Sequence, residues 1–197
     1  MRIDEMIALT RNGELNPHLR VAMDRSQGFE LLVAHARKCL TPMIVETGCV
    51  RATNDWGGAG GSTLIFAAVA DECDGAFVYI DNEQRHLDTA EKLLKEQGSR
   101  TARPMLSDSV AALNRWFCPI DVLYLDSLDT TELGYAEHCL AEAVAAQPHM
   151  AADAMIGIDD SPTVDGAVIG KGTLAVPYLV EQGWRVIHAG YQAVLTR

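Results

Sequence analysis

Short apolar runs typical of β-strands alternate along most of this chain with longer amphipathic stretches typical of helices. Strands are expected at 43–46, 77–80, 104–106, 120–125, 154–158, 184–188 and 192–195, and helices at 61–71, 87–97, 109–116, 132–146 and 174–182. This alternation is typical of helices that cover a mainly parallel sheet. Because so few residues separate the last two strands, they should pair antiparallel. The predicted fold is α/β, with a mostly parallel seven-stranded sheet that ends in an antiparallel hairpin.

The first forty residues show no strand pattern, and residues 19–40 are expected to form one or two helices. Such helices would cover a sheet edge or a ligand. We therefore expect an N-terminal helical cap segment, residues 1–40, followed by an α/β domain, residues 41–197. A length of 197 residues suits one domain of ordinary size.

The charge balance argues against several partners. Asp and Glu number 27 against 16 Lys and Arg, which gives a formal net charge of -11. Such a surface repels phosphates, so no nucleic-acid partner is expected. No apolar run approaches the roughly 20 residues that a membrane span needs, and acidic residues interrupt the start where a signal peptide would be apolar. The five cysteines contain no C-x-x-C motif and indicate reduced thiols, so we expect a cytoplasmic protein without a membrane partner.

Four of the five expected parallel strands carry acidic residues at their ends: Glu46, Asp81, Asp126 and the pair Asp159 and Asp160. In an open parallel sheet, ligands bind at the carboxyl ends of the strands. The sequence therefore predicts a ligand site at that edge of the sheet.

A glycine-rich loop follows the first of these strands and opens a helix. Glycines let backbone approach a ligand closely, and a helix N-terminus favours anionic groups. No Gly-Lys-Ser/Thr sequence follows, which disfavours hydrolysis of nucleoside triphosphates. The tight G-x-G-x-x-G spacing of nicotinamide-dependent oxidoreductases is also missing.

Three motifs together carry a family resemblance. Glu46-Thr-Gly48, then Gly60-Gly61-Ser62-Thr63, then Tyr79-Ile80-Asp81 resemble class I S-adenosylmethionine-dependent methyltransferases, in the branch whose first motif reads E-x-G-x-x-x-G-G-S-T. The resemblance extends over approximately residues 41–197 and implies a Rossmann-like, doubly wound fold. This chain departs from the pattern by an insertion at 49–58 in the first loop.

The resemblance implies a set of cofactor-binding residues: Glu46, Gly48, Gly60, Gly61, Ser62, Asp81, Asp108 and Ser109. Glu46 and Gly48 would meet the amino-acid end of S-adenosylmethionine. Asp81 would accept hydrogen bonds from the ribose hydroxyls, which suits a carboxylate. Asp108, with Ser109 beside it, would lie near the adenine, or Asp108 would instead cap the following helix.

The acids after the fourth and fifth strands raise the question of a metal. Asp126, Asp159 and Asp160 would repel one another unless a cation or protons intervened, and oxygen ligands favour Mg²⁺. Their placement resembles metal-dependent O-methyltransferases of small molecules, which implies that Mg²⁺ binds two substrate oxygens and lowers the pKa of a hydroxyl. The alternative is that Asp159 and Asp160 cap the following turn while Asp126 only bounds the pocket.

The candidate catalytic residues are Asp126, Asp129 and Lys171. Asp129 either takes a proton or is a solvated loop acid. Lys171 either faces the substrate, neutralises the acids or lies at the surface. Trp56, in the insertion, is expected to be exposed and able to stack on adenine or on an aromatic substrate.

These observations predict an S-adenosylmethionine-dependent methyltransferase that carries out Mg²⁺-assisted O-methylation of a small hydroxylated molecule. The alternatives are a metal-free methyltransferase, an enzyme that cleaves S-adenosylmethionine, and a non-catalytic cofactor-binding sensor. A homodimer that completes the pocket is compatible with each of them.

Overall fold

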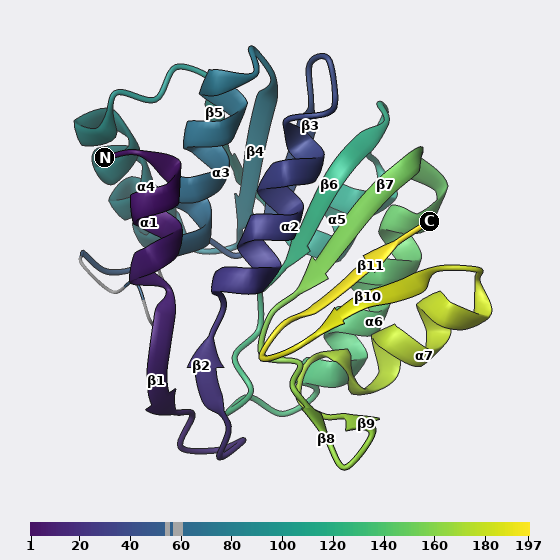
Figure 1. Ribbon diagram of the computed structural model, residues 1–197. Coiled ribbons are helices and arrows are strands. Elements are labelled where there is room, and N and C mark those ends of the chain that lie inside the picture. The colour runs from purple at the N-terminus through teal and green to yellow at the C-terminus, as the bar shows by residue number, and fades with distance from the viewer. Residues whose placement is uncertain (54–55, 57–60) are drawn as a thin grey trace.

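A seven-stranded sheet lies between two layers of helices in the computed structural model, which describes residues 1–53, 56 and 61–197 (Figure 1). The strand order is β10-β11-β7-β6-β3-β4-β5. Strands β3 to β7 run parallel, and β11 pairs antiparallel with both β7 and β10. The bounds are β3 Met43–Thr47, β4 Ala76–Asp81, β5 Ala102–Leu106, β6 Ile120–Leu125, β7 Met150–Ile158, β10 Arg185–Ala189 and β11 Ala193–Thr196. The predicted fold class is confirmed.

Each face of the sheet carries its own apolar core. One face is covered by α1 Ile3–Leu9, α2 Ser26–Ala36, α3 Gly61–Glu72 and α4 Gln84–Gln97; the other is covered by α5 Ser109–Asn114, α6 Tyr135–Ala146 and α7 Gly172–Glu181, with the short 3₁₀ helix η1 Gln147–His149 after α6. Neighbouring strand residues alternate between the two cores, as Ile44 and Val45 do in β3. Burial on both faces explains why the strands read as nearly continuous apolar runs.

The N-terminal segment differs from the helical prediction. Strand β1, Arg11–Leu15, pairs antiparallel with β2, Ala22–Asp24, and helix α2 begins only at Ser26. The turn between these strands holds Arg20 in a left-handed conformation, with φ at 56°, and the Asn16 carboxamide accepts hydrogen bonds from two backbone amides of the turn. Within residues 1–53, 56 and 61–197, this short hairpin pairs with no other strand, and its register is irregular, so it leaves no alternating apolar pattern to detect.

A second small hairpin, β8 Thr163–Val164 with β9 Ala167–Val168, was also absent from the prediction. Its turn is Asp165-Gly166, and both residues have positive φ, as a two-residue hairpin turn of type I′ requires. The hairpin returns the chain from the end of β7 to the start of α7. Within the described residues, we find no helix with the length and apolar character needed to cross a membrane.

Candidate functional site

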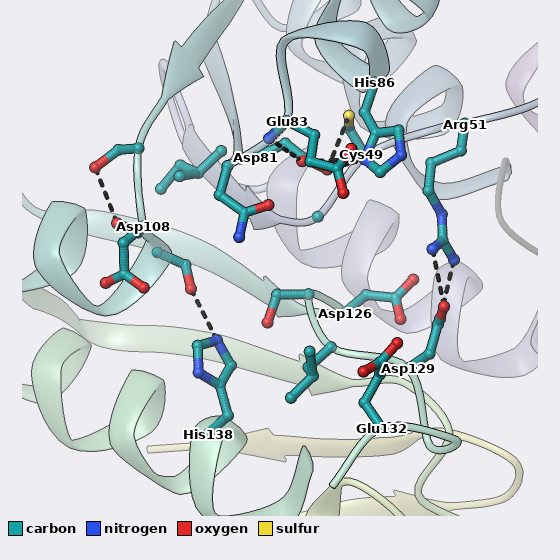
Figure 2. Close-up of a pocket in the computed structure, with 17 residues that line it drawn as sticks. Cys49, Arg51, Asp81, Glu83, His86, Asp108, Asp126, Asp129, Glu132 and His138 are labelled. Atoms are coloured by element: carbon teal, nitrogen blue, oxygen red, sulfur yellow. Dashed lines mark hydrogen bonds and ion pairs between the residues drawn. The ribbon is translucent and has the colours of Figure 1, made fainter. Parts of the chain in front are cut away.

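A cavity of about 300 Å³ opens at the carboxyl ends of β3, β4, β5 and β6 (Figure 2). Its wall includes residues at or just after the ends of these strands, among them Gly48, Asp81, Asp108 and Asp126. This is the edge at which parallel sheets bind ligands, and it is the edge that the acidic residues indicated in the sequence.

Asp81 presents its carboxylate to this cavity (Figure 2). The Glu83 amide donates to Asp81 Oδ1 at 2.8 Å, and the Cys49 thiol donates to Oδ2 at 3.6 Å. The His86 ring nitrogen Nδ1 lies 3.1 Å from Oδ1 and 3.2 Å from Oδ2. The chain therefore holds this carboxylate in place at the cavity wall.

Gly48 adopts a left-handed conformation with φ at 80°. A methyl group at this position would overlap the backbone carbonyl of Asp126, so the first loop passes against the end of β6 only because residue 48 is glycine.

Glu46 lies beneath the first loop and does not line the cavity. The Thr63 hydroxyl donates to Glu46 Oε2 at 2.8 Å and accepts from the Val50 amide at 2.9 Å. Burial raises the pKa of Glu46 to about 8, so the carboxyl is protonated at neutral pH. This network ties β3 to the start of α3. Gly61 and Ser62 lie at that helix start, near Trp56 and Arg25, while the predicted cofactor residue Gly60 falls outside the described residues.

Asp108 caps helix α5, because its Oδ1 accepts a hydrogen bond of 2.8 Å from the Ala111 amide. The capping alternative is therefore correct, while the contact with adenine stays a prediction. Ser109 is buried at the cavity wall, and its hydroxyl lies 3.1 Å from Nε2 of His138.

The structure brings Asp126, Asp159 and Asp160 together, with one carboxylate oxygen of each within 4.8 Å of the others. Arg25 donates from Nε to both oxygens of Asp159, at 2.8 and 2.9 Å, and its Nη2 lies 3.3 Å from Asp160. The Lys171 ammonium donates to Asp126 and lies 3.3 Å from Asp160 Oδ2. The Arg25 and Lys171 side chains are only 7 % and 3 % exposed, so both charges are buried with their partners.

Burial and charge oppose each other in this cluster. Burial raises the pKa of Asp126 to about 7, although Lys171 works against the rise. Burial also raises the pKa of Asp159, but the charge and hydrogen bonds of Arg25 lower it further, so that it stays below its ordinary value. For Lys171, burial lowers the pKa, and the carboxylates around it raise it by more. Lys171 and Asp159 are therefore charged at neutral pH.

A magnesium ion does not fit this arrangement. Mg²⁺ requires oxygen ligands in near-octahedral geometry. Among the described residues, the oxygens that would supply them already accept from Lys171 and Arg25, and the Tyr191 hydroxyl donates to Asp160. Two buried cations already face the three carboxylates, so an ion bound there would compete for their oxygens with Lys171 and Arg25.

Asp129 pairs with Arg51 of the first loop through two hydrogen bonds of 2.9 Å each (Figure 2). The hydrogen bonds with Arg51 hold the pKa of Asp129 below its ordinary value. This pairing makes Asp129 a poor proton acceptor. Trp56, which the sequence indicated as exposed, is partly buried and packs against the core on the α1–α4 face.

Sequence reasoning missed Arg25 and Arg51, which belong to no motif. Three converging acids signalled a need for cations, and neutralisation by Lys171 was one of the alternatives. Arg25 is 134 residues away from Asp159 along the chain, and the residues that flank it gave no indication that its side chain would reach Asp159.

A sequence model of a protein family described as a methyltransferase domain matches residues 57–161. No curated protein matches the sequence. Among solved structures, the SAH-bound methyltransferase PaMTH1 from Podospora anserina is 14 % identical, with 99 % of this chain and 86 % of that chain covered and a TM-score of 0.61. A Klebsiella pneumoniae protein assigned as an O-methyltransferase is 16 % identical, with 98 % and 88 % covered and a TM-score of 0.58.

An rRNA methylase from Streptococcus thermophilus is 11 % identical, with 87 % of this chain and 93 % of that chain covered and a TM-score of 0.54. At these identities, the structural similarities show a shared fold and leave the substrate open. The family match covers more than half of the chain. The chain therefore belongs to the methyltransferase-domain family, which confirms that the predicted enzyme is a methyltransferase.

Proposed function

We propose that this enzyme transfers a methyl group from S-adenosylmethionine to a hydroxyl oxygen of a small, non-anionic molecule. The observation that carries the proposal is the acidic cavity at the carboxyl ends of the strands. The described residues that line it include six acids: Asp81, Glu83, Asp108, Asp126, Asp129 and Glu132. Among the same described residues, Lys and Arg are represented by Arg51 alone. Such a lining favours a positively charged or neutral occupant.

The donor would occupy the part of the cavity nearest β3, β4 and β5. Bound there, S-adenosylmethionine supplies an electrophilic methyl group on a positively charged sulfur. Asp81 would accept hydrogen bonds from the ribose hydroxyls, and Ser109 would lie beside the adenine. Gly48 would let the first loop pass close to the amino-acid end of the donor, with Glu46 supporting that loop from below.

Asp126 is the proposed proton acceptor. It follows β6 at the cavity wall, and its side chain is 23 % exposed. As the acceptor oxygen took the methyl group and the donor left as the neutral thioether, the Asp126 carboxylate would accept the hydroxyl proton. Lys171, which donates to one Asp126 oxygen, would orient the carboxylate for this step. Alignment of the reactants by the cavity supplies much of the rate enhancement.

Of the two chemical alternatives for methyl transfer, the metal-free one is favoured, because Lys171 and Arg25 already neutralise the acids that Mg²⁺ would need. The magnesium ion predicted from the sequence therefore enters no step here.

Five free cysteines support the proposed cytoplasmic location, where thiols stay reduced.

The cofactor site is tested by Asp81→Asn, which preserves shape and removes charge. We expect the affinity for S-adenosylhomocysteine to fall by about 1–3 kcal/mol in isothermal titration calorimetry, because hydrogen bonds to a charged acceptor are lost. Asp88→Asn, at an exposed position of α4, is the matched control and should bind as the wild type does. Equal affinity in both variants would rule out the ribose role of Asp81.

A further inference from the structure

Lys171 is buried, and two unusual backbone conformations nearby hold it in that position. It directly precedes α7, its side chain is 3 % exposed, and its amide donates to the carbonyl of Asp160 at 3.0 Å. Burying an ammonium group is costly unless charged and hydrogen-bonded partners compensate. Here the side chain contacts Asp126 and Asp160, so the compensation comes from two of the three clustered acids.

Two unusual backbone conformations bring Lys171 to this place. Asp160 has φ at 44° and Gly170 has φ at 72°. A methyl group at Gly170 would overlap the Asp160 carbonyl, so the close approach requires glycine. The Ser161 hydroxyl accepts from the Gly172 amide at 2.7 Å, which fixes the start of α7 against the end of β7. The strain is held by surrounding contacts, as is common at functional sites.

A second cation completes the cluster from the opposite end of the chain. Arg25 pairs with Asp159, approaches Asp160, and lies over the Tyr191 ring at 4.6 Å from its centroid. The Gln192 amide lies 3.4 Å from Asp159. Asp159 thus has its own cation, and the position shared by Asp126 and Asp160 belongs to Lys171.

We propose that Lys171 is the resident cation of this active site, permanently occupying the position between Asp126 and Asp160 that a divalent metal ion would otherwise take. Lys171 is then a positioning residue that acts through Asp126. Its role in the reaction rests on the proposed function, but its occupation of the cation position does not. Removal of the amine should open a three-carboxylate site that binds a divalent metal.

The test measures metal binding by the full chain without cofactor or acceptor, using Mn²⁺ as the probe and electron paramagnetic resonance as the readout. Wild-type protein dialysed against EDTA should show no saturable Mn²⁺ binding. Lys171→Ala should bind one Mn²⁺ per chain, with saturation at Mn²⁺ concentrations at least 10-fold below the highest one at which the wild type shows none. Lys171→Arg keeps the charge and should gain no metal, and neither should Lys92→Ala, at an exposed position of α4. One tight Mn²⁺ on the wild type, or none on Lys171→Ala, would overturn the proposal.

Thermal unfolding covers the case in which Lys171→Ala is poorly folded, because a metal that binds the native state stabilises it. Mn²⁺ should raise the melting temperature of Lys171→Ala and leave that of the wild type unchanged. A shift in the wild type, or no shift in the variant, argues against the resident cation. Because no measurement here involves methyl transfer, failure of the proposed function would appear separately, as absent binding of S-adenosylhomocysteine or absent turnover.

Discussion

Burial decides the charge of Glu46 at the end of β3. Its side chain hydrogen-bonds to Ser62 and Thr63, yet two neutral hydroxyls do not compensate the burial of a carboxylate. The consequence is a pKa raised from 4.5 to about 8. A residue that reads in the sequence as one more acid at a strand end is therefore a neutral hydrogen-bonding group in the folded protein at neutral pH.

This shift predicts a pH-dependent stability that Glu46→Gln should remove. Between pH 4.5 and about 8, the native state keeps the Glu46 proton while the unfolded chain loses it, so the free energy of unfolding falls as pH rises. The fall is at most about 1.4 kcal/mol per pH unit. Urea denaturation at pH 5, 6.5 and 8 should show a flatter profile for the variant than for the wild type. Parallel profiles would show that the Glu46 carboxyl is not shifted.

Among the elements, the segment that joins β7 to α7 is the part of the site whose backbone is most tightly constrained. Hairpin β8–β9 folds out and returns, and Gly170 then passes against Asp160 so that Lys171 enters the cluster. The bounds of the strands and helices do not reveal this requirement, because it comes from a single backbone contact between Gly170 and Asp160, which are ten positions apart.

Two glycine substitutions in this segment test the demand. Both Gly166 and Gly170 have positive φ, but only at Gly170 would a methyl group overlap neighbouring backbone. Gly166→Ala should cost about 1–2 kcal/mol from left-handed strain. Gly170→Ala should cost at least about 2 kcal/mol more, measured by chemical denaturation. Similar losses in the two variants would mean that the loop relaxes easily around Asp160.

For the molecule as a whole, net charge is the property that bears on the class of substrate. The sequence carries a formal net charge of -11, and the described cavity wall is mostly acidic among its charged residues. A shared fold with an rRNA methylase therefore does not imply a shared substrate.

We accordingly expect no specific RNA binding. Fluorescence anisotropy with labelled single-stranded and duplex RNA at 0.15 M salt should give dissociation constants weaker than roughly 10⁻⁴ M, the weak end of non-specific binding. The comparison is S-adenosylhomocysteine, which should bind under the same conditions. Saturable RNA binding that weakens steeply with added salt would point instead to phosphate contacts and to a nucleic-acid substrate.

Much of the architecture could be predicted because hydrophobic periodicity is a local property of the chain. The seven sheet strands, the helices between them and the antiparallel end were all found from short windows of sequence. The hairpins β1–β2 and β8–β9 were not predicted. In the described structure their strands have two to five residues and pair with each other, so they bury too few side chains to produce a hydrophobic pattern in the sequence. The Asp165-Gly166 turn was the one local signal for the second hairpin.

The sequence by itself determined the order of strands and helices, the edge of the sheet where acids gather, and the glycine that the first loop needs at Gly48. Only the tertiary structure decided which cations meet those acids. Arg25 and Lys171 lie 134 and 45 residues from the carboxylates that they contact, Asp159 and Asp126. Local patterns report which face of an element is buried, whereas the partner of a buried charge depends on how distant segments pack. That packing placed Arg25 and Lys171 against the acids from which a metal site was predicted.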